Sequence, residues 1–270
     1  MKTGFPVIFA VLLALGASWI GFVLAPAIQL GSVQQTTVLN TSDLYPSLRQ
    51  GDATLGLQVY RANGCAACHT EQVRQEGVTC EVVLTSGGKN PEAVTNLLAT
   101  LKLDHLTKEE ADGVAQQITT VGGKSETHIV PAGVDLDHGW GVRRSVAEDF
   151  LYDNPVQIGN LRVGPDLANI GVRSPDANWQ LLHLYAPGSV AANSRMPSFR
   201  YLFEVQTNSG SPSPEALNLP AAFAPKPGVE VVPKPEARQL VAYLLSLRAN
   251  VPVYDAPFTP PAPAPAAAKP

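Results

Sequence analysis

The stretch Cys65-Ala66-Ala67-Cys68-His69 decides the fold of the chain's central domain. It is a C-x-x-C-H motif, in which two thiols and an imidazole are spaced to hold a haem: the cysteines add across the vinyl groups as thioethers, and the histidine binds the iron. A disulfide or half of a zinc site is the alternative, but zinc needs two more ligands and only Cys80 is left among the cysteines. The motif therefore predicts one covalently attached haem c. We expect Cys80 to be a small buried residue rather than a reactive thiol.

Size, charge and cysteine usage set the class of protein. The 270 residues suffice for one or two domains with a hydrophobic core. The formal net charge is −4 and there is no basic cluster, which argues against a nucleic-acid partner. Two of the three cysteines belong to the haem motif, a usage that fits c-type chemistry outside the cytoplasm.

The N-terminal region has the composition of a membrane-spanning helix. No charged side chain occurs from Thr3 to Ser42, and Phe5 to Leu24 is almost wholly apolar, about the 20 residues that a span requires. A cleaved signal peptide is the alternative, with Ala25-Pro26-Ala27 as the cleavage site. The apolar stretch is longer than the roughly 7–15 residues typical of such peptides. We expect an uncleaved, single-pass anchor in a bacterial inner membrane. Residues 5–25 would contact lipid, the N-terminus would be cytoplasmic and the haem domain periplasmic.

The rest of the chain divides around the haem motif. We expect an anchor over residues 1–30, a polar linker over 31–52, a cytochrome c domain over 53–79 and 135–250, an insert over 80–134, and a disordered Pro/Ala-rich tail over 251–270. A short helix over 53–60 should lead into the motif. The clearest soluble helix is 236–248, with Pro235 in its first turn. The first and last helices of small c-type cytochromes cross closely, and Gly56 and Tyr60 against Tyr243 would form that contact.

The predicted insert alternates strand and helix signals. A strand over 81–84 is followed by a helix that Asn90 caps, with Pro91 in its first position. Thr107 and Glu110 form a capping box for a second helix, and 127–130 could return as a strand. These signals predict a small β-α-α-β unit. We expect His105 and His128 in it to be surface or packing residues.

A haem bound by His69 needs a sixth iron ligand, and a methionine thioether is the commonest choice for electron transfer. The chain has two methionines, of which Met1 is the initiator, so Met196 is the candidate. Gly164-Pro165 lies between the haem motif and Met196. In small c-type cytochromes the proline carbonyl of such a loop accepts a hydrogen bond from the ligating histidine. Residues 206–235 are rich in Pro, Ser and Ala, which predicts a meandering surface loop.

Taken in order, these pieces resemble the mono-haem cytochrome c subunit (subunit II) of cbb(3)-type cytochrome c oxidases. The resemblance follows short segments spread over about half of the chain: 60–65, 68–69, 72–74, 140–141, 145–148, 152–155, 162–168, 170–173, Trp179, 183–184, Pro187 and 196–199. The insert after Arg74, the long proline-rich segment after Phe203 and the extended tail depart from that family.

The resemblance implies a mainly α, class I cytochrome c-like domain behind one transmembrane helix, with a small α+β insert. Electrons would arrive from another c-type cytochrome and leave to a haem in a catalytic haem-copper oxidase subunit. This chain would have no catalytic centre of its own. Arg162, Arg173 and Trp179 are expected near the haem propionates, although each could equally be a surface or packing residue. His183 is expected to pack rather than bind iron.

Three alternatives stay open at this point. The chain could serve another respiratory complex, such as a nitric oxide reductase, whose small subunit is also anchored and carries one haem c. It could be a haem-based sensor with a labile sixth ligand, in which the insert transmits the signal. It could also be a structural subunit whose insert docks a partner.

Overall fold

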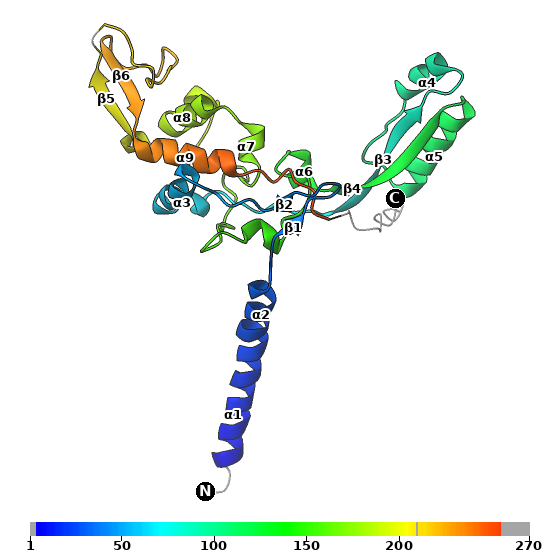
Figure 1. The fold of residues 1–270 in the computed structure, drawn as a ribbon, viewed down its shortest axis with the longest axis horizontal. Coiled ribbons are helices and arrows are strands. Elements are labelled where there is room, and N and C mark those ends of the chain that lie inside the picture. The colour runs from blue at the N-terminus through cyan, green and yellow to red at the C-terminus, as the bar shows by residue number, and fades with distance from the viewer. Residues whose placement is uncertain (1–3, 209, 255–270) are drawn as a thin grey trace, which may run out of the picture.

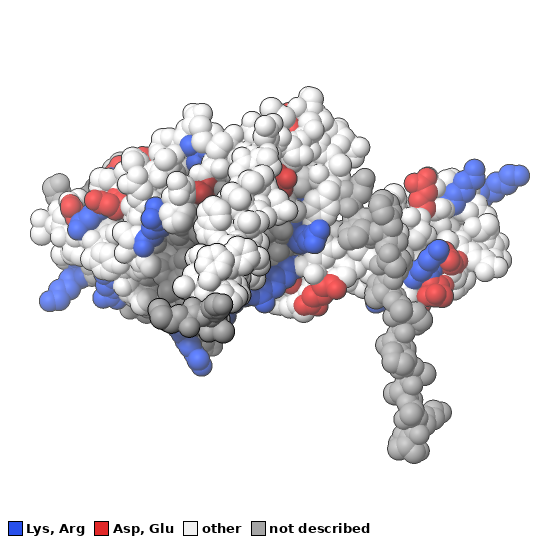
Figure 2. Space-filling view, turned by 90° about the horizontal axis from the view of Figure 1, so that it is seen from below, with Lys and Arg blue, Asp and Glu red and all other residues white. Residues whose placement is uncertain are grey.

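The computed structural model describes residues 4–208 and 210–254. Figure 1 shows three parts: a long N-terminal helix, a body to which that helix leads, and a lobe that extends from the body in another direction. Figure 2 shows that acidic and basic side chains both occur on the body and on the lobe. This mixed surface agrees with the small net charge of the sequence.

The N-terminal part is one continuous apolar helix. It comprises α1 (Gly4–Trp19), the π-helical η1 (Ile20–Leu24) and α2 (Ala25–Gly31). Its 28 residues are long and apolar enough to cross a membrane, and the rest of the protein does not cover them. The helix contains the expected span and continues beyond it to Gly31, which suggests membrane anchoring.

The linker contains a short hairpin that its polar composition did not predict. The strands β1 (Thr36–Thr37) and β2 (Leu44–Tyr45) pair in antiparallel fashion. The N–H of Leu39, in the turn between them, donates to the carbonyl of Pro252 at 2.9 Å. The start of the predicted tail is therefore bound to the linker. The remainder of that predicted disordered tail, 255–270, lies outside the described residues.

Arg143, which belongs to the body, contacts the same region. We call the contacts of its side chain, given below, the Arg143 clamp. Its guanidinium lies 5.6 Å from the ring centroid of Tyr45 and 5.7 Å from that of Tyr254. It donates to the carbonyl of Val251 at 2.8 Å and to both carboxylate oxygens of Asp149, at 2.7 and 3.0 Å. The clamp joins linker, body and C-terminal segment, and the carboxylate raises the pKa of this already basic group.

The first and last helices of the body cross in close contact, as expected from the sequence. They are α3 (Asp52–Ala62) and α9 (Pro235–Ser246). A Cβ atom on Gly56 would lie 1.9 Å from the carbonyl oxygen of Gln239, so only glycine permits this approach. The rings of Tyr60 and Tyr243 pack at a centroid distance of 5.2 Å, and both side chains are fully buried.

Short helices complete the body between these two. They are the 3-10 helix η2 (Cys65–Ala67), α6 (Val134–Asp137), η3 (Ala147–Phe150), α7 (Ile170–Arg173), α8 (Ala177–Tyr185), η4 (Pro187–Ser189) and η5 (Arg200–Leu202). One hydrophobic cluster, the body core, unites α3, α7, α8 and α9. Its most deeply buried members include Tyr60, Val231, Ala237, Leu240 and Tyr243.

The prediction of a meandering loop over 206–235 is wrong at both ends. β5 (Phe203–Thr207) and β6 (Val229–Pro233) form an antiparallel hairpin, with Val205 paired to Val231. β-branched valines recur along β6, and Val231 is buried in the body core, which outweighs the proline-rich composition of the connecting segment. Glu230 fastens that segment by accepting from Gln206 Nε2 and from the Ser213 N–H, each at 2.7 Å.

The lobe is the predicted β-α-α-β unit. It consists of β3 (Gly77–Ser86), α4 (Pro91–Leu98), α5 (Lys108–Thr120) and β4 (Lys124–Ala132), and we call residues 77–132 the insert lobe. Both predicted caps are confirmed: Asn90 Oδ1 accepts from the Ala93 N–H, and Thr107 and Glu110 form the capping box. The lobe has its own hydrophobic cluster, the lobe core, formed by Cys80, Val82, Leu106, Ala111, Val114 and Ile118.

Other lobe predictions concern single residues. Cys80 is buried, 1% exposed, and burial raises the pKa of its thiol. His105 and His128 are exposed, as expected. The prediction of a mainly helical chain is confirmed only in part. One apolar N-terminal helix is present, while the described residues also form three two-stranded sheets, one each in the linker, the body and the lobe.

Candidate haem-binding site

The C-x-x-C-H motif lies at the C-terminal end of α3. Gly64 adopts a left-handed conformation, with φ of 66°, and ends the helix so that η2 can begin at Cys65. The N–H groups of Cys68 and His69 both donate to the Cys65 carbonyl, at 3.1 and 3.0 Å. Cys65 is half-buried against the body core and Cys68 is exposed, and both are free thiols. Burial raises the pKa of the Cys65 thiol to about 12.

His69 faces the Gly164-Pro165 loop. Its Nδ1 lies 2.8 Å from the carbonyl oxygen of Pro165. A Cβ on Gly164 would lie 2.3 Å from the imidazole Cε1, so the loop can approach the ring only as glycine. Since Nδ1 is engaged by an acceptor, the ring is held with Nδ1 protonated and Nε2 left as the nitrogen that can bind a metal.

Met196 lies on a stretch without regular secondary structure between η4 and η5. Its N–H donates to Ser194 Oγ at 3.3 Å, and its half-buried side chain packs against the body core, as that of Cys65 does. The structure therefore places the proposed sixth ligand and the haem motif on one hydrophobic cluster.

Arg162, Arg173 and Trp179, which are expected near the propionates, differ in how many contacts their side chains already make within the protein. Four of the five N–H groups of Arg162 donate to Thr70, Gln72, Asp135 and Asp166, which leaves one for any other acceptor.

Arg173 and Trp179 are less fully used. Arg173 donates through Nη2 to the Asp166 carbonyl, while its Nε is buried without a partner. Burial lowers the pKa of Arg173. Trp179 stacks on His183 at a centroid distance of 4.9 Å and an interplanar angle of 6°. His183 Nδ1 is buried without a partner, and burial and the neighbouring His69 lower the pKa of His183.

These residues fit a haem c. Two free thiols and an imidazole with a fixed ring would provide covalent attachment and one iron ligand. Leu161 and Val163, which precede the glycine-proline loop, are 62% and 70% exposed, so apolar surface next to the motif is available to a porphyrin. The N–H of Val163 donates to the Cys68 carbonyl at 2.9 Å, which places this surface beside the second thiol. The unpaired Arg173 Nε–H supplies a donor for a carboxylate.

A buried carboxyl group close to the motif was not found from the sequence. Glu71 is 4% exposed and accepts from the Tyr243 hydroxyl at 2.9 and 3.0 Å. Desolvation raises its pKa to about 8, although the Tyr243 hydrogen bond and the Arg49 charge lower it. The available sequence signal was an acidic residue two positions after the haem histidine; the partner tyrosine lies on the last helix, which only the fold reveals.

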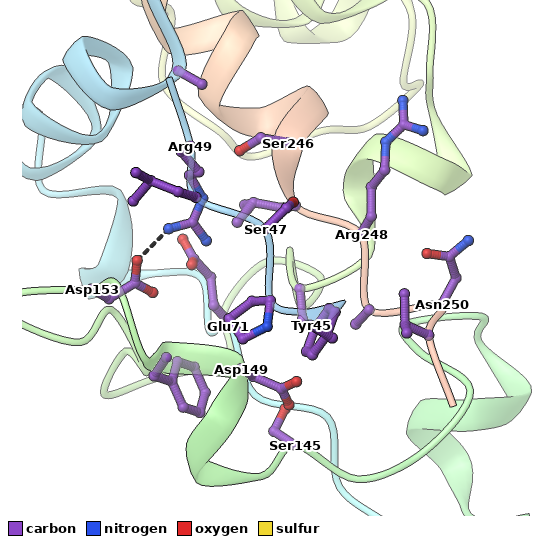
Figure 3. A pocket seen from close by; sticks show the side chains of 18 of the residues that line it. Tyr45, Ser47, Arg49, Glu71, Ser145, Asp149, Asp153, Ser246, Arg248 and Asn250 are labelled. Atoms are coloured by element: carbon purple, nitrogen blue, oxygen red, sulfur yellow. Dashed lines mark hydrogen bonds and ion pairs between the residues drawn. The ribbon is translucent and has the colours of Figure 1, made fainter. Parts of the chain in front are cut away.

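Glu71 forms part of the wall of a cavity of about 440 Å³ between the linker, the body and the end of α9. Figure 3 shows Arg49 from the linker extending into this cavity, where it pairs with Asp153. The Arg49 guanidinium also lies 5.2 Å from the ring centroid of Tyr243. Polar groups from the linker and from both ends of the body thus meet beside the helix crossing.

Comparison with known families gives a match over part of the chain. Residues 138–222, about a third of the chain, match the family model described as cytochrome c oxidase, mono-heme subunit/FixO. This segment is similar to the mono-haem subunits of cytochrome c oxidases, and the match supports that class of protein. Within this class it supports a subunit of the cbb(3)-type oxidase, the family that the sequence resembles. The matched segment contains the glycine-proline loop and Met196, whereas the C-x-x-C-H motif precedes it. No curated protein matches the sequence.

Proposed function

We propose that this chain is a membrane-anchored, periplasmic mono-haem cytochrome c that passes single electrons to the catalytic subunit of a cbb(3)-type terminal oxidase. The observation that carries the proposal is the contact of His69 Nδ1 with the Pro165 carbonyl at 2.8 Å. It links the C-x-x-C-H motif to the segment that matches the oxidase family. The motif and the family match are independent lines of support, because the motif lies outside the matched segment.

In this proposal each site residue has one task. Cys65 and Cys68 would hold the haem covalently, and His69 and Met196 would bind its iron. When bound, haem c supplies one-electron iron chemistry at a potential that a thioether ligand raises. The Pro165 carbonyl fixes the imidazole. The buried, unpaired Arg173 Nε would donate to a propionate, and Trp179 would lie near the propionates. Electrons would arrive from another c-type cytochrome, and oxygen chemistry would take place in the catalytic subunit.

The apolar helix over 4–31 supports an anchor in the bacterial inner membrane. In this arrangement its N-terminus is cytoplasmic and the haem domain lies on the periplasmic side, where haem is attached to C-x-x-C-H motifs. Lipid contact extends over residues 5–25.

Purification of the full-length chain from membranes in detergent, with haem staining and identification of co-purifying subunits, tests the proposal. We expect one covalent haem on this chain and a catalytic partner with haem b and copper. A partner that contains non-haem iron would contradict the assignment and indicate a nitric oxide reductase-like complex. Carbon monoxide that binds readily to the reduced parent protein at neutral pH would indicate a haem sensor instead.

The substitution Met196→Ala tests the sixth ligand. We expect the haem to stay attached, its reduction potential to fall, and the iron to become accessible to carbon monoxide, because the thioether favours the reduced iron. Leu219→Ala is the matched control, since Leu219 also packs half-buried against the body core. It should leave the potential unchanged. An unchanged potential in Met196→Ala would refute the ligand assignment.

A further inference from the structure

The two ends of the insert lobe meet at the carboxylate of Asp135, which follows β4 and is 5% exposed. Its Oδ2 accepts from the backbone N–H of Arg74, just before the lobe begins, at 2.7 Å. Its Oδ1 accepts from Arg162 Nη1, also at 2.7 Å. The buried carboxylate lies on the segment that leaves the lobe, and it binds the backbone of the segment that enters the lobe.

Arg162 connects this carboxylate to the segment that follows His69. Its Nε donates to Thr70 Oγ1 at 2.9 Å, and its Nη2 donates to the carbonyl of Gln72 at 2.7 Å. The guanidinium carbon lies 4.9 Å from the ring centroid of Trp140, which is within the range of a cation–π contact. Arg162 thus has a fixed position between the lobe ends and the haem motif.

Asp166 binds the same segment from the other side and is fully buried. Its Oδ2 accepts from the Thr70 hydroxyl at 2.5 Å and from the Gln72 N–H at 2.9 Å. Asp166 directly follows Pro165, whose carbonyl lies 2.8 Å from His69 Nδ1. Thr70 follows the histidine, and Asp166 follows the hydrogen-bond acceptor Pro165. The hydrogen bond between Thr70 and Asp166 therefore fixes the geometry of the acceptor and the imidazole.

We infer that Asp135, Arg162 and Asp166 are positioning residues for His69, and that the two segments flanking the insert lobe, which Asp135 joins, are part of the framework that orients this imidazole. They act through Thr70 and Pro165 and not on the iron. The inference rests on the proposed function, in which His69 is the haem ligand. It gives Arg162 a role within the protein that its four bonds support.

The expected consequence is a change in reduction potential. A hydrogen bond from Nδ1 to a carbonyl makes an imidazole a more basic ligand, which favours the oxidised iron. Loosening the framework weakens this hydrogen bond, so the potential should rise. We expect a change of about tenfold in the ratio of reduced to oxidised haem at a fixed ambient potential, which is about 59 mV for a one-electron couple.

The substitution Thr70→Val tests the framework without changing any charge. Valine keeps the volume but removes the hydroxyl that accepts from Arg162 and donates to Asp166. A redox titration of the visible haem bands in the full-length protein should show the tenfold change. Thr70→Ser, which restores the hydroxyl, should return the ratio to within about twofold of the parent. A serine variant that behaves like the valine variant would overturn the role of the hydroxyl.

The substitution Asp135→Asn tests the contribution of the junction between the segments that flank the lobe. Its matched control is Asp149→Asn, which weakens another buried aspartate–arginine pair, with Arg143 at 2.7 Å. Asp149 has no hydrogen bond to Thr70 or to the glycine-proline loop. We expect both variants to lower the melting temperature and only Asp135→Asn to raise the potential.

Two results would overturn the inference. Equal potentials in the two asparagine variants would show that Asp135 has no special connection to His69. A parent-like potential in both Thr70→Val and Asp135→Asn would show that the framework does not act on the imidazole. In either case a covalently bound haem in the parent leaves the proposed function intact. A parent without covalent haem would overturn the proposed function itself.

Discussion

The body and the insert lobe reach a packed core in opposite ways. The body core gathers side chains from Tyr60 to Leu247, nearly the whole length of the chain after the linker. The lobe core is formed entirely between Cys80 and Ile118. Contacts between residues close in sequence form with a smaller loss of chain entropy. The lobe therefore has the means to fold locally, whereas the body depends on segments that meet over long distances.

The two regions also differ in their buried polar groups. The body holds buried side-chain atoms without hydrogen-bond partners, among them Tyr60 Oη, Arg173 Nε and His183 Nδ1. Within the lobe, all of which the structure describes, no side-chain atom of this kind occurs. Since buried polar groups are normally satisfied, the unpaired Arg173 Nε and His183 Nδ1 fit the proposal that the body binds a cofactor, and the lobe offers no such atoms.

The double substitution Cys65→Ala with Cys68→Ala should have the largest effect on this comparison. We expect haem staining to be lost entirely, because both thioether bonds are absent. Hydrogen exchange should then accelerate throughout the body and stay at the parent rate in residues 77–132. Covalently retained haem would show that the motif was misread, and equal loss of protection in body and lobe would contradict their independence.

The substitution Ile118→Ala should affect the lobe instead. Ile118 is fully buried in the lobe core, and truncation of such a side chain typically costs about 2–5 kcal/mol. Hydrogen exchange against denaturant should show this loss in β3, β4 and α5, with the α3–α9 crossing unchanged. The neighbouring Thr119→Ala, at an exposed position, is the control and should stay within about 0.5 kcal/mol of the parent. A comparable loss in α9 would mean that the two cores unfold together.

The substitution Gly56→Ala should destabilise the body by about 3 kcal/mol, because a methyl group has to displace the Gln239 carbonyl oxygen from the helix crossing. The measurement is again segment-resolved hydrogen exchange in denaturant, now followed in α3 and α9. A neutral effect would show that this crossing can open without cost.

A glycine-to-alanine substitution in the lobe should have the opposite effect on stability. Gly113 lies within α5, and a Cβ added there would meet nothing within 4 Å. Gly113→Ala should therefore stabilise the lobe by about 0.5–1 kcal/mol through helix propensity alone. Slower exchange in α5 with an unchanged body would complete the contrast with Gly56→Ala, and a destabilised lobe would contradict it.

How far the sequence predicted the structure depended on how local the signal was. Asn90, Thr107 and Glu110 predicted both lobe helices, because a capping residue acts within the next few positions. Glycine at 56 and tyrosine at 243 predicted the helix crossing through a likeness to small cytochromes. The β5–β6 hairpin was missed because its pairing is decided by the burial of Val231 in a distant core, which overrides the local composition.

The polar framework of the site was beyond sequence reasoning for a related reason. Asp135 and Arg162 are 2.7 Å apart at their charged atoms, but Asp135 lies in α6 and Arg162 follows η3 in the chain. A charged residue in a sequence does not reveal its partner, and a propionate and an aspartate offer an arginine the same carboxylate. The motif residues could be predicted individually, whereas the network that holds them required coordinates.

The Arg143 clamp bears on how the molecule would move under the proposed membrane anchoring. The clamp and the Leu39 hydrogen bond join the linker to the body and to the C-terminal segment, so little free chain remains between the end of α2 and the first fixed residues of the hairpin. Figure 1 shows the helix leading directly into this junction. With its swivelling restricted, the body would encounter a partner in the same bilayer by diffusion in two dimensions, with much the same side presented at each collision.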